Sequence, residues 1–284
     1  MRSITLGDFT IFPVLETYIH RDPADFFPDL TPEKLKANRS WIDPRAFDEQ
    51  GFFKLPIQTY VVRSRNRTVV VDTCYGNDKR RREGGAGHML KTSFLKDLTV
   101  AGVKPEEVDF VMCTHLHADH VGWNTRLENG RWVPTFPKAK YLFGRKDWDL
   151  FSARAAQRPG GGKVIGDSVT PVVEAGQGVM VDGSHQVDDG IRIEPLPGHT
   201  PGHAGVYFLS KGRTAIMTGD MLHHPLQLAE PDWNSNACED PAQARATRRA
   251  FIERHADTGD LVVPAHFPEP GYITRAKEGW RFKT

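Results

Sequence analysis

The chain has 284 residues, of which 39% are hydrophobic, and its formal net charge at pH 7 is +1. This length can bury the core of one large domain or two small ones. The balanced charge gives no overall field that would select nucleic acid or an acidic membrane. Neither a secretory signal pattern nor an apolar run near ~20 residues is found, so a cytoplasmic location is expected. The three cysteines do not form a disulfide framework, and Cys74 and Cys113 are expected to be small buried residues.

Strand and helix patterns alternate along the first 120 residues. The predicted strands lie at residues 4–15, with a break at Gly7-Asp8, and at residues 57–63, 68–72 and 108–113. A short helix is predicted to begin at Thr31, because threonine caps a helix and Pro32 suits its first turn. Apolar residues at helical spacing predict an amphipathic helix over residues 91–101. The basic run Lys79–Arg82 is interpreted as a solvated loop rather than a binding patch, since an acidic residue and glycines follow.

The second half of the chain is less regular before residue 190. Its predicted elements are a strand at 141–143, a helix at 146–156, a strand from 191, a hairpin joining 206–209 to 215–218, and a helix from 240 to about 255. Residues 158–162 are interpreted as a mobile break. Periodicity alone supports an α/β chain with at least one layered sheet. We expect residues 1–284 to form a single domain, in which residues 20–55 and 121–190 are insertions that act as lid or dimer elements.

The most informative stretch is Thr114-His115-Leu116-His117-Ala118-Asp119-His120, which directly follows an apolar strand. A buried strand that ends in three imidazoles and one carboxylate delivers several metal ligands to one edge of a sheet. Histidine nitrogen and carboxylate oxygen suit zinc and other borderline divalent metals. A single histidine is more often a surface or core residue, but four ligand-type residues at this spacing predict a metal site.

This His-x-His-x-Asp-His pattern after a hydrophobic strand resembles the signature of the metallo-β-lactamase superfamily. Four further blocks are similar to that family in order: Asp72 after Val69–Val71, Gly198-His199-Thr200, Gly219-Asp220, and His266 after an apolar run. The resemblance implies that Asp72 supports the metal loop without being a ligand. It also implies an α/β (α+β) fold, a four-layer αβ/βα sandwich with the metal site between two mixed sheets.

The resemblance assigns ligands to two metal ions. The first metal is held by His115, His117 and His199, the second by Asp119, His120 and His266, and Asp220 bridges both. A single tetrahedral zinc uses about four ligands, which is fewer than the seven candidates. We therefore expect two divalent metal ions as cofactors, zinc first, with iron, manganese and cobalt as alternatives.

The expected chemistry is hydrolysis by a hydroxide that bridges the two metals. The catalytic candidates are Asp119, which can pass a proton to the leaving oxygen, Asp220, and His223. Related lactonases carry a tyrosine near the position of His223, so this histidine is a candidate electrophile or proton donor. His203 either orients a ligand or packs in its loop. The remaining histidines are expected at the surface, namely His20, His88, His185 and His255.

Two of the candidate ligands discriminate between branches of the superfamily. The antibiotic-degrading branch generally carries cysteine or serine where Asp220 stands, so β-lactamase activity is not expected as the main role. The diiron, oxygen-reducing branch usually carries glutamate where His117 stands, so hydrolysis is favoured over redox chemistry. Eighteen residues follow His266, and a glyoxalase II-like thioesterase, which needs a longer C-terminal segment, is not expected.

The Gly-His-Thr-Pro-Gly-His and Asp-His-Val-Gly-Trp-Asn segments are similar to the branch of N-acyl homoserine lactonases and methyl parathion hydrolase-like enzymes. The predicted function is therefore a dinuclear metal-dependent hydrolase of a lactone or ester, with phosphotriester (organophosphate) hydrolysis as the alternative. Two alternatives of other classes are an iron-dependent oxidoreductase on the same fold and a metal-stabilised binding protein.

The expected partner is a small hydrophobic ester, lactone or phosphotriester, and neither nucleic acid nor a membrane is expected. The oligomeric state is left open, with a homodimer as one alternative. Aromatic residues are abundant in both insertions, and they either line an apolar cleft or bury the insertions or a dimer interface. They are Phe26, Phe27, Trp41, Phe47, Phe52, Phe53, Trp123, Trp132, Trp148 and Phe151.

Overall fold

The computed structural model describes residues 3–157 and 163–284. The chain divides into two compact units, and each is described by itself. Unit 1 consists of Met1–Thr17 and Ile57–His185, and unit 2 consists of Tyr18–Pro56 and Gln186–Thr284. The break predicted at residues 158–162 lies outside the described residues. The single domain and the lid or dimer role of the insertions stay predictions.

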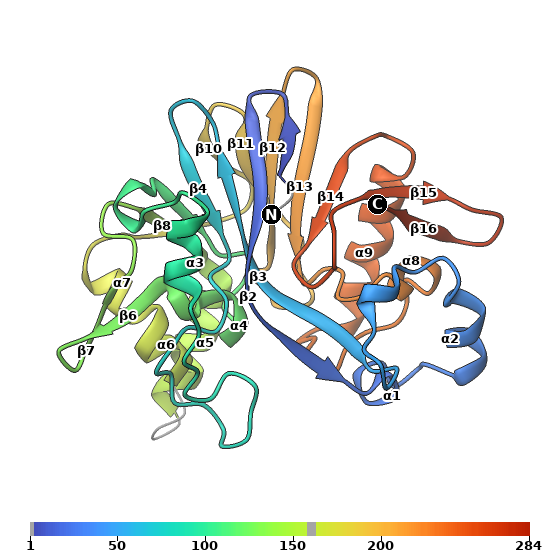
Figure 1. Cartoon of the computed structure of the whole chain (residues 1–284), viewed down its shortest axis with the longest axis horizontal. Coiled ribbons are helices and arrows are strands. Elements are labelled where there is room, and N and C mark those ends of the chain that lie inside the picture. Colours follow the sequence, from blue (N-terminus) through green and yellow to red (C-terminus); the bar gives the residue numbers. More distant parts are fainter. Residues whose placement is uncertain (1–2, 158–162) are drawn as a thin grey trace. The chain divides into compact units, whose positions relative to one another are not determined.

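The main sheet of unit 1 has seven strands in the order β1-β2-β3-β4-β5-β8-β9 (Figure 1). Their bounds are β1 Ile4–Leu6, β2 Phe9–Arg21, β3 Phe53–Arg63, β4 Thr68–Val71, β5 Phe110–Met112, β8 Lys140–Gly144 and β9 Gly178–Val181. The sheet is mixed, because β1 with β2 and β3 with β4 run antiparallel, whereas β4, β5, β8 and β9 run parallel. The boundaries between the two units fall within β2 and β3.

The centre of this sheet brings two strand ends together. Val69, Val70 and Val71 of β4 are all buried, which is typical of a parallel strand covered on both faces. Val71 pairs with Met112 of β5, so the two strands end at the same edge. The residues that follow them, Asp72 and the histidine cluster, are therefore neighbours.

The remaining elements of unit 1 are short. They are the hairpin of β6 Thr125–Glu128 and β7 Arg131–Pro134, the helices α3 Phe94–Val100, α4 Ala118–Val121, α5 Arg145–Gln157, α6 Lys163–Ser168 and α7 Thr170–Glu174, and the 3₁₀ turns η2 Pro105–Glu107 and η3 Gly122–Asn124. The helix predicted over residues 91–101 is confirmed, although it begins three residues later, at Phe94. The β6–β7 hairpin, α6, α7 and β9 were not predicted, because four- to six-residue elements carry too little periodicity.

Unit 2 contains a five-stranded mixed sheet in the order β10-β11-β12-β13-β14. The strands are β10 His185–Asp188, β11 Ile191–Pro195, β12 Ala204–Ser210, β13 Arg213–Gly219 and β14 Leu261–Pro264. The hairpin predicted between residues 206 and 218 is confirmed by the antiparallel pairing of β12 with β13. Strand β14 then adds parallel to β13, so that both end at one edge.

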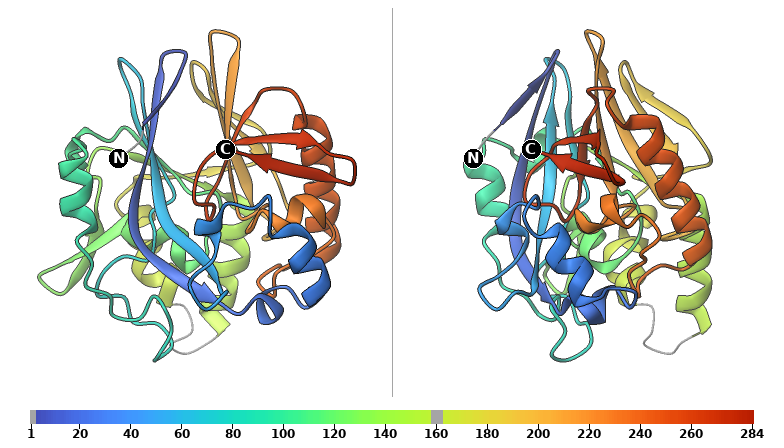
Figure 2. Two further views of the ribbon diagram at one scale, coloured as in Figure 1. Left: turned by 45° about the vertical axis from the view of Figure 1, so that its right-hand side comes forward. Right: turned by 90° about the vertical axis from the view of Figure 1, so that its right-hand side faces the viewer.

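The helix predicted from residue 240 to about 255 is confirmed as α9, Pro241–His255, which covers this sheet (Figure 2). Asp240 caps it, because its carboxylate accepts the N–H of Gln243. Phe251 and Ile252 share a buried cluster with Ile216 of β13 and Val262 of β14. The other elements are α1 Pro23–Phe26, α2 Pro32–Asn38, η1 Pro44–Ala46, α8 Leu226–Ala229 and the hairpin of β15 Tyr272–Arg275 and β16 Trp280–Lys283.

Two predictions of exposed residues are wrong, one for the Lys79–Arg82 run and one for His255. Lys79 is fully buried, and its Nζ donates to Thr125 Oγ1 (2.5 Å) and to the carbonyl of Asp167 (2.9 Å). Arg81 forms a two-point ion pair with the carboxylate of Asp167, so only part of the Lys79–Arg82 run is a solvated loop. The physical reason is a carboxylate on α6 that is distant in sequence and neutralises these cations.

His255 is also buried, with 5% of its surface exposed, because the last turn of α9 faces the core. Its ring lies 4.4 Å from that of Phe251, and its Nδ1 is 2.8 Å from Asp260 Oδ2. His88 is half-buried and bonded to the backbone of Arg81. The exposure expected of His20 and His185, and the burial expected of Cys74 and Cys113, are confirmed.

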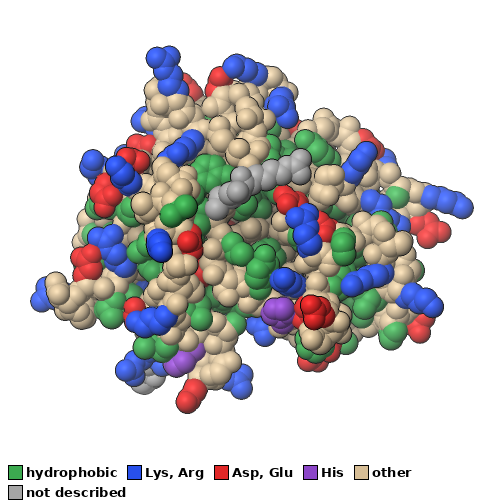
Figure 3. Space-filling view, viewed as in Figure 1, with side chains coloured by type: hydrophobic (Ala, Val, Ile, Leu, Met, Phe, Trp, Pro, Cys, Tyr) green, Lys and Arg blue, Asp and Glu red, His purple; other side chains and the backbone are tan. Residues whose placement is uncertain are grey.

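The aromatic residues of the insertions are mainly interior. Phe27, Phe47, Phe53 and Trp123 are buried, which favours the alternative that they bury the insertions, whereas Phe52 is exposed. On the face drawn in Figure 3, basic and acidic side chains are interspersed, as the balanced net charge suggests. Within residues 3–157 and 163–284, no helix combines the length and the apolar character needed to cross a membrane.

Candidate metal centre

The histidine cluster of unit 1 occupies the turn after β5. His117 is the N-cap residue of α4, and the helix begins at Ala118. The rings of His115 and His117 lie 4.6 Å apart, and those of His115 and His120 lie 4.0 Å apart. His115 and His120 are buried. The turn and the short helix thus bring three histidine rings that are close in sequence near one another.

Asp72 fixes this turn from the neighbouring strand. Its Oδ1 accepts the backbone N–H of Thr114 at 2.8 Å, and its Oδ2 lies 2.9 Å from His120 Nδ1. The Nδ1–H of His120 therefore donates to a carboxylate, which directs the lone pair of Nε2 toward a metal and makes it more basic. The supporting role expected for Asp72 agrees with these contacts.

Further residues of unit 1 hold the same turn, and Gly122, Glu16 and Asp147 among them were not identified from the sequence. A Cβ atom on Gly122 would lie 1.8 Å from the carbonyl oxygen of Tyr75, so only glycine permits this backbone contact. The carboxylate of Glu16 accepts the N–H of Tyr75 (2.7 Å) and the indole N–H of Trp123 (2.6 Å), while burial raises the pKa of Glu16. Asp147 of α5 accepts the N–H of Leu116 at 3.3 Å.

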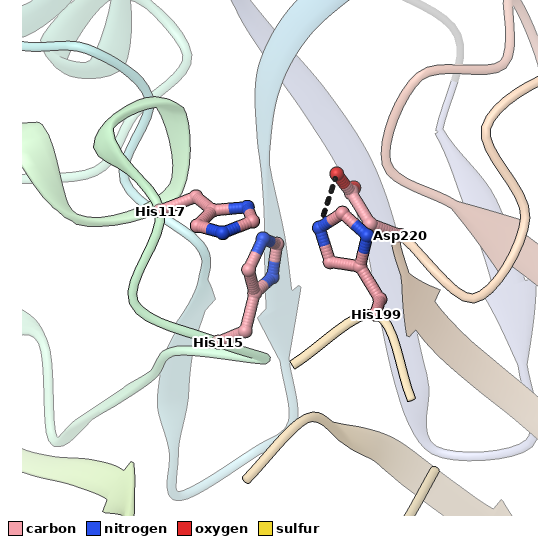
Figure 4. A group of neighbouring side chains, drawn as sticks. All are labelled: His115, His117, His199 and Asp220. Atoms are coloured by element: carbon pink, nitrogen blue, oxygen red, sulfur yellow. Dashed lines mark ion pairs between the residues drawn. The ribbon is translucent and has the colours of Figure 1, made fainter. Parts of the chain in front are cut away.

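The candidate ligands of unit 2 come from three separate segments. His199 lies in the turn after β11, Asp220 follows β13, and His266 follows β14. His199 Nε2 is 3.4 Å from Asp220 Oδ2, the pair that is dashed in Figure 4, where His115 and His117 of unit 1 are also drawn. His266 Nε2 is 3.1 Å from Asp220 Oδ1. The two carboxylate oxygens of Asp220 thus face different imidazoles.

These separations match the geometry of shared metal ligands. Zinc–nitrogen and zinc–oxygen bonds of about 2.0–2.1 Å at tetrahedral angles place two ligands of one metal roughly 3.3 Å apart. His199 with one oxygen of Asp220, and His266 with the other, both fit that spacing. A carboxylate with one ligand partner on each oxygen has the geometry of a bridge between two metals.

The orientation of the imidazoles in unit 2 also fits metal binding. His266 Nδ1 is 3.0 Å from the carbonyl oxygen of Pro56, and His199 Nδ1 is 3.7 Å from Cys238 Sγ. Each Nδ1–H can donate to that acceptor, which leaves the Nε2 lone pair facing Asp220 and any metal held there. The buried imidazoles and carboxylates of this site therefore fit divalent metals in donor type and in orientation.

His203 and His223 surround Asp220 without being in the candidate ligand set. His203 Nε2 accepts the backbone N–H of Asp220 at 3.0 Å, while its Nδ1 is 2.9 Å from the carbonyl oxygen of Leu196. These contacts tie His203 to the backbone of Asp220 and favour the alternative that it orients a ligand. His223 Nε2 lies 3.3 Å from Asp220 Oδ2, and burial lowers the pKa of His223.

Arg248 of α9 holds the chain after Asp220 and was not identified from the sequence. Its buried guanidinium donates to the carbonyl oxygens of Met221 (3.0 Å), Pro231 (2.6 Å) and Trp233 (2.9 Å). Burial lowers the pKa of Arg248 to about 10. No local pattern marks such a residue, because its acceptors, these three carbonyl groups and the side-chain oxygen of Asn234, lie in another segment.

Among the described residues, ligand-type side chains form two groups that can hold metal ions. They are His115, His117, His199 and Asp220, and Asp119, His120 and His266. Their histidine and aspartate composition is consistent with a dinuclear metal site.

Comparisons with known proteins agree with this chemistry. The metallo-beta-lactamase superfamily matches residues 53–266. Metallo-beta-lactamase domain-containing protein 1 of Xenopus laevis is 27% identical over 204 residues, which cover 71% of this chain and 66% of that protein. An N-acyl homoserine lactonase of Bacillus cereus is 22% identical over 164 residues, which cover 54% of this chain and 58% of the lactonase. The chain spans about two thirds or less of the length of these two relatives.

Solved structures show the same fold along nearly all of the chain. The hydrolase AbOPH of the beta lactamase superfamily has a TM-score of 0.80 and 24% identity, and covers 99% of this chain and 95% of its own. AidC, a dizinc quorum-quenching lactonase, has a TM-score of 0.77 and 20% identity, with 99% and 96% covered. The expected α/β sandwich with two mixed sheets is confirmed. The chain belongs to the metallo-β-lactamase superfamily, and its described residues include two groups of histidine and aspartate side chains that can hold metal ions.

Proposed function

We propose that this protein is a dinuclear metal-dependent hydrolase that cleaves a lactone or ester. The observation that carries the proposal is the position of Asp220, whose two oxygens lie 3.4 and 3.1 Å from the Nε2 atoms of His199 and His266. In the proposed site, His115, His117 and His199 hold one metal, and Asp119, His120 and His266 hold the other. Zinc is the proposed ion, because histidine and carboxylate ligands suit it.

Two bound divalent metals supply an activated water and polarise the carbonyl oxygen that it attacks. The protein side chains determine the positions of these ions and provide the groups that transfer protons. Asp220 separates the two ligand sets by using one oxygen for each. Asp72 and Pro56 accept the Nδ1–H groups of His120 and His266, which keeps each Nε2 available as a ligand.

We propose Asp119 as the residue that passes a proton to the leaving oxygen. Its Oδ2 is 3.7 Å from His120 Nε2, and its side chain is 18% exposed, compared with 6% for Asp220. This exposure lets Asp119 exchange protons with solvent, whereas Asp220 is buried as a bridging ligand should be. A general acid of this kind typically contributes about 10²–10⁴-fold.

We propose that His223 holds the substrate oxygen through a hydrogen bond. Its Nε2 is 3.3 Å from Asp220 Oδ2 and 3.3 Å from Ser235 Oγ, so an Nε2–H that donates to the substrate oxygen would lie beside the bridging carboxylate. The ring of Phe26 stands edge-on to it at 5.6 Å. An imidazole next to an apolar wall suits a substrate that has a polar ester group on an apolar chain.

The lactone preference is supported by relatives. Several curated relatives are named N-acyl homoserine lactonase, and AidC was solved with the product N-hexnoyl-L-homoserine. In this chain, the half-buried Phe26 packs on the buried Phe27 and Phe53 with ring centroids 4.9 and 6.0 Å apart, so of these three rings only Phe26 can meet a substrate. We propose a neutral lactone or ester with an apolar acyl group as the substrate, and phosphotriesters as the alternative.

The test is a substrate panel assayed on the purified chain with its metal content measured by mass spectrometry. The panel contains short- and long-chain acyl homoserine lactones, aryl esters, an aryl phosphotriester and a chromogenic β-lactam. We expect lactone or ester turnover that disappears on chelation and returns when about two zinc ions per chain are restored. His185→Ala, which changes an exposed histidine of unit 1, serves as the control for nonspecific loss of metal.

Three outcomes would contradict the proposal. Bound iron with oxygen consumption and no hydrolysis would indicate the oxidoreductase alternative. Chelation that unfolds the chain, which has no turnover with any substrate, would indicate a metal-stabilised binding protein. Faster cleavage of the phosphotriester than of every lactone and ester would indicate organophosphate hydrolysis.

A further inference from the structure

We propose that unit 1 contains a second ligand site, separate from the metal centre, that binds an amphipathic carboxylate. The site is a pocket of about 480 Å³ between the loop 78–89, the β6–β7 hairpin and α6. Cavities of about 300–1,000 Å³ are typical of small-molecule sites. None of the residues that line it is a candidate metal ligand.

The wall of the pocket gathers apolar side chains that are unusual at a surface. Met89 and Leu127 are large hydrophobic residues with 41% and 44% of their surface exposed, and both line the pocket together with Trp132. They come from two different segments, so their proximity is not explained by one amphipathic element. An apolar chain or ring in the pocket would remove these groups from water.

The indole of Trp132 already carries a cation. The buried ammonium of Lys79, which does not line the pocket, lies 3.6 Å from the ring centroid of Trp132. The ring attracts cations through its negative face, and Lys79 satisfies that attraction. Because Lys79 Nζ already lies over the Trp132 ring, a cationic ligand would gain little there, so the pocket favours an anionic or neutral ligand.

The remaining charges favour the anion. Both carboxylates in the pocket wall are neutralised, Asp78 by Lys91 and Asp167 by Arg81 at 2.6 Å. Arg80 and Lys163 also line the pocket and are exposed, and within the described part of the chain neither makes an ion pair with a carboxylate. The pocket therefore offers two cations beside an apolar wall, which complements one carboxylate attached to an apolar chain.

Gly166 offers a way to close the pocket without disturbing the fold. It lines the pocket on α6, and a Cβ atom built on it meets nothing within 4 Å. Its φ is not in the left-handed region, so a side chain is tolerated, and a helix interior favours almost any residue over glycine. Gly166→Met would therefore fill the pocket while leaving the melting temperature unchanged or slightly higher.

The test is calorimetric titration of the metal-loaded full chain with decanoate at a concentration below micelle formation. We expect saturable one-to-one binding that is weakened at least about tenfold, or ~1.4 kcal/mol, by Gly166→Met and by the double change Arg80→Gln with Lys163→Gln. The matched control is Arg65→Gln with Lys138→Gln, which removes two exposed cations of unit 1 that do not line the pocket. Decanol and decyltrimethylammonium should bind more weakly than decanoate.

The Asp220→Ala variant separates this site from the metal centre, where a carboxylate can also bind. Decanoate binding that survives in Asp220→Ala and is lost in Gly166→Met supports the pocket. Binding that is lost in Asp220→Ala but kept in Gly166→Met would assign decanoate to the metal centre and overturn the inference. Absence of saturable binding in the unmodified chain would overturn it as well, and neither result would bear on lactone or ester hydrolysis.

Discussion

The two units supply their candidate ligands in opposite ways. Unit 1 presents His115, His117, Asp119 and His120 from one turn after β5, so a single local event positions them all. Unit 2 presents His199, Asp220 and His266 from the ends of three different strands. The first arrangement depends on a short helix and one supporting strand, whereas the second depends on the correct pairing of β11 to β14.

The supporting atoms also differ between the units. In unit 1, a carboxylate, Asp72, receives the Nδ1–H of His120 at 2.9 Å. In unit 2, the carbonyl of Pro56 and the thiol of Cys238 are the partners of His266 and His199. A carboxylate makes its imidazole more basic than a neutral acceptor does. The comparison therefore predicts that metal affinity in unit 1 depends on the charged carboxylate of Asp72, whereas metal affinity in unit 2 depends mainly on Asp220 itself.

The largest effect is expected for Asp220→Ala. This change removes both oxygens that face His199 and His266, so both metals should be lost or weakened. We expect turnover to fall by more than about 100-fold, beyond the 10–100-fold range of supporting residues. Metal content and steady-state kinetics measure it, with the exposed Asp189→Ala as the control. If Asp220→Ala kept its full metal content and its full rate, Asp220 would not be a metal ligand.

A smaller loss is expected when the support in unit 1 is removed. Asp72→Ala deletes the acceptor of Thr114 N–H and His120 Nδ1–H, and should lower metal affinity or activity about 10–100-fold. Competition with a fluorescent chelator measures the affinity. Asp109→Ala is the matched control, because Asp109 also accepts a backbone N–H, from Thr68, but contacts no candidate ligand. Equal losses of affinity in both variants would show that Asp72 acts only on stability.

His203→Leu probes the corresponding support in unit 2. The change leaves the N–H of Asp220 without its imidazole acceptor and should lower kcat about tenfold, the lower end of the range for supporting residues, with little effect on KM. The visible spectrum of the cobalt-substituted protein should shift, because the carboxylate moves relative to the metals. His255→Leu, which removes a buried imidazole bonded to Asp260, should leave that spectrum unchanged. An unaltered cobalt spectrum in His203→Leu would limit His203 to packing.

The last expected effect concerns stability and lies outside the metal centre. Burial lowers the pKa of Lys79 from 10.5 to about 7, so between these values the unfolded chain binds the extra proton. The free energy of unfolding should therefore rise with pH from about 7 to 10.5 through this residue. Lys79→Met should flatten that rise in urea denaturation at constant metal content, while the exposed Lys138→Met should keep it. An unchanged slope in Lys79→Met would show that its ammonium stays charged.

The sequence allowed the strands, the long helices and the metal motif to be predicted, because each is a local pattern. The strand at 68–72 and the helix at 240–255 follow from apolar runs and capping residues, and both are confirmed. The β6–β7 hairpin, α6 and α7 were missed, and Lys79 and His255 were expected in solvent. The short elements carry too little periodicity to be recognised, and His255 is buried because the last turn of α9 faces the core. Lys79, in contrast, is held by Thr125 and Asp167, which are distant in sequence.

For the metal centre, the amino-acid order by itself determined which residues can be ligands, because three imidazoles and a carboxylate after a buried strand have few other uses. Only the tertiary structure decided that Asp220 turns one oxygen to His199 and the other to His266. It also decided which atoms hold those imidazoles, including Cys238 and the carbonyl of Pro56. Ligand identity is a property of a side chain, whereas its orientation is set by hydrogen bonds from segments that meet only when the strands pair.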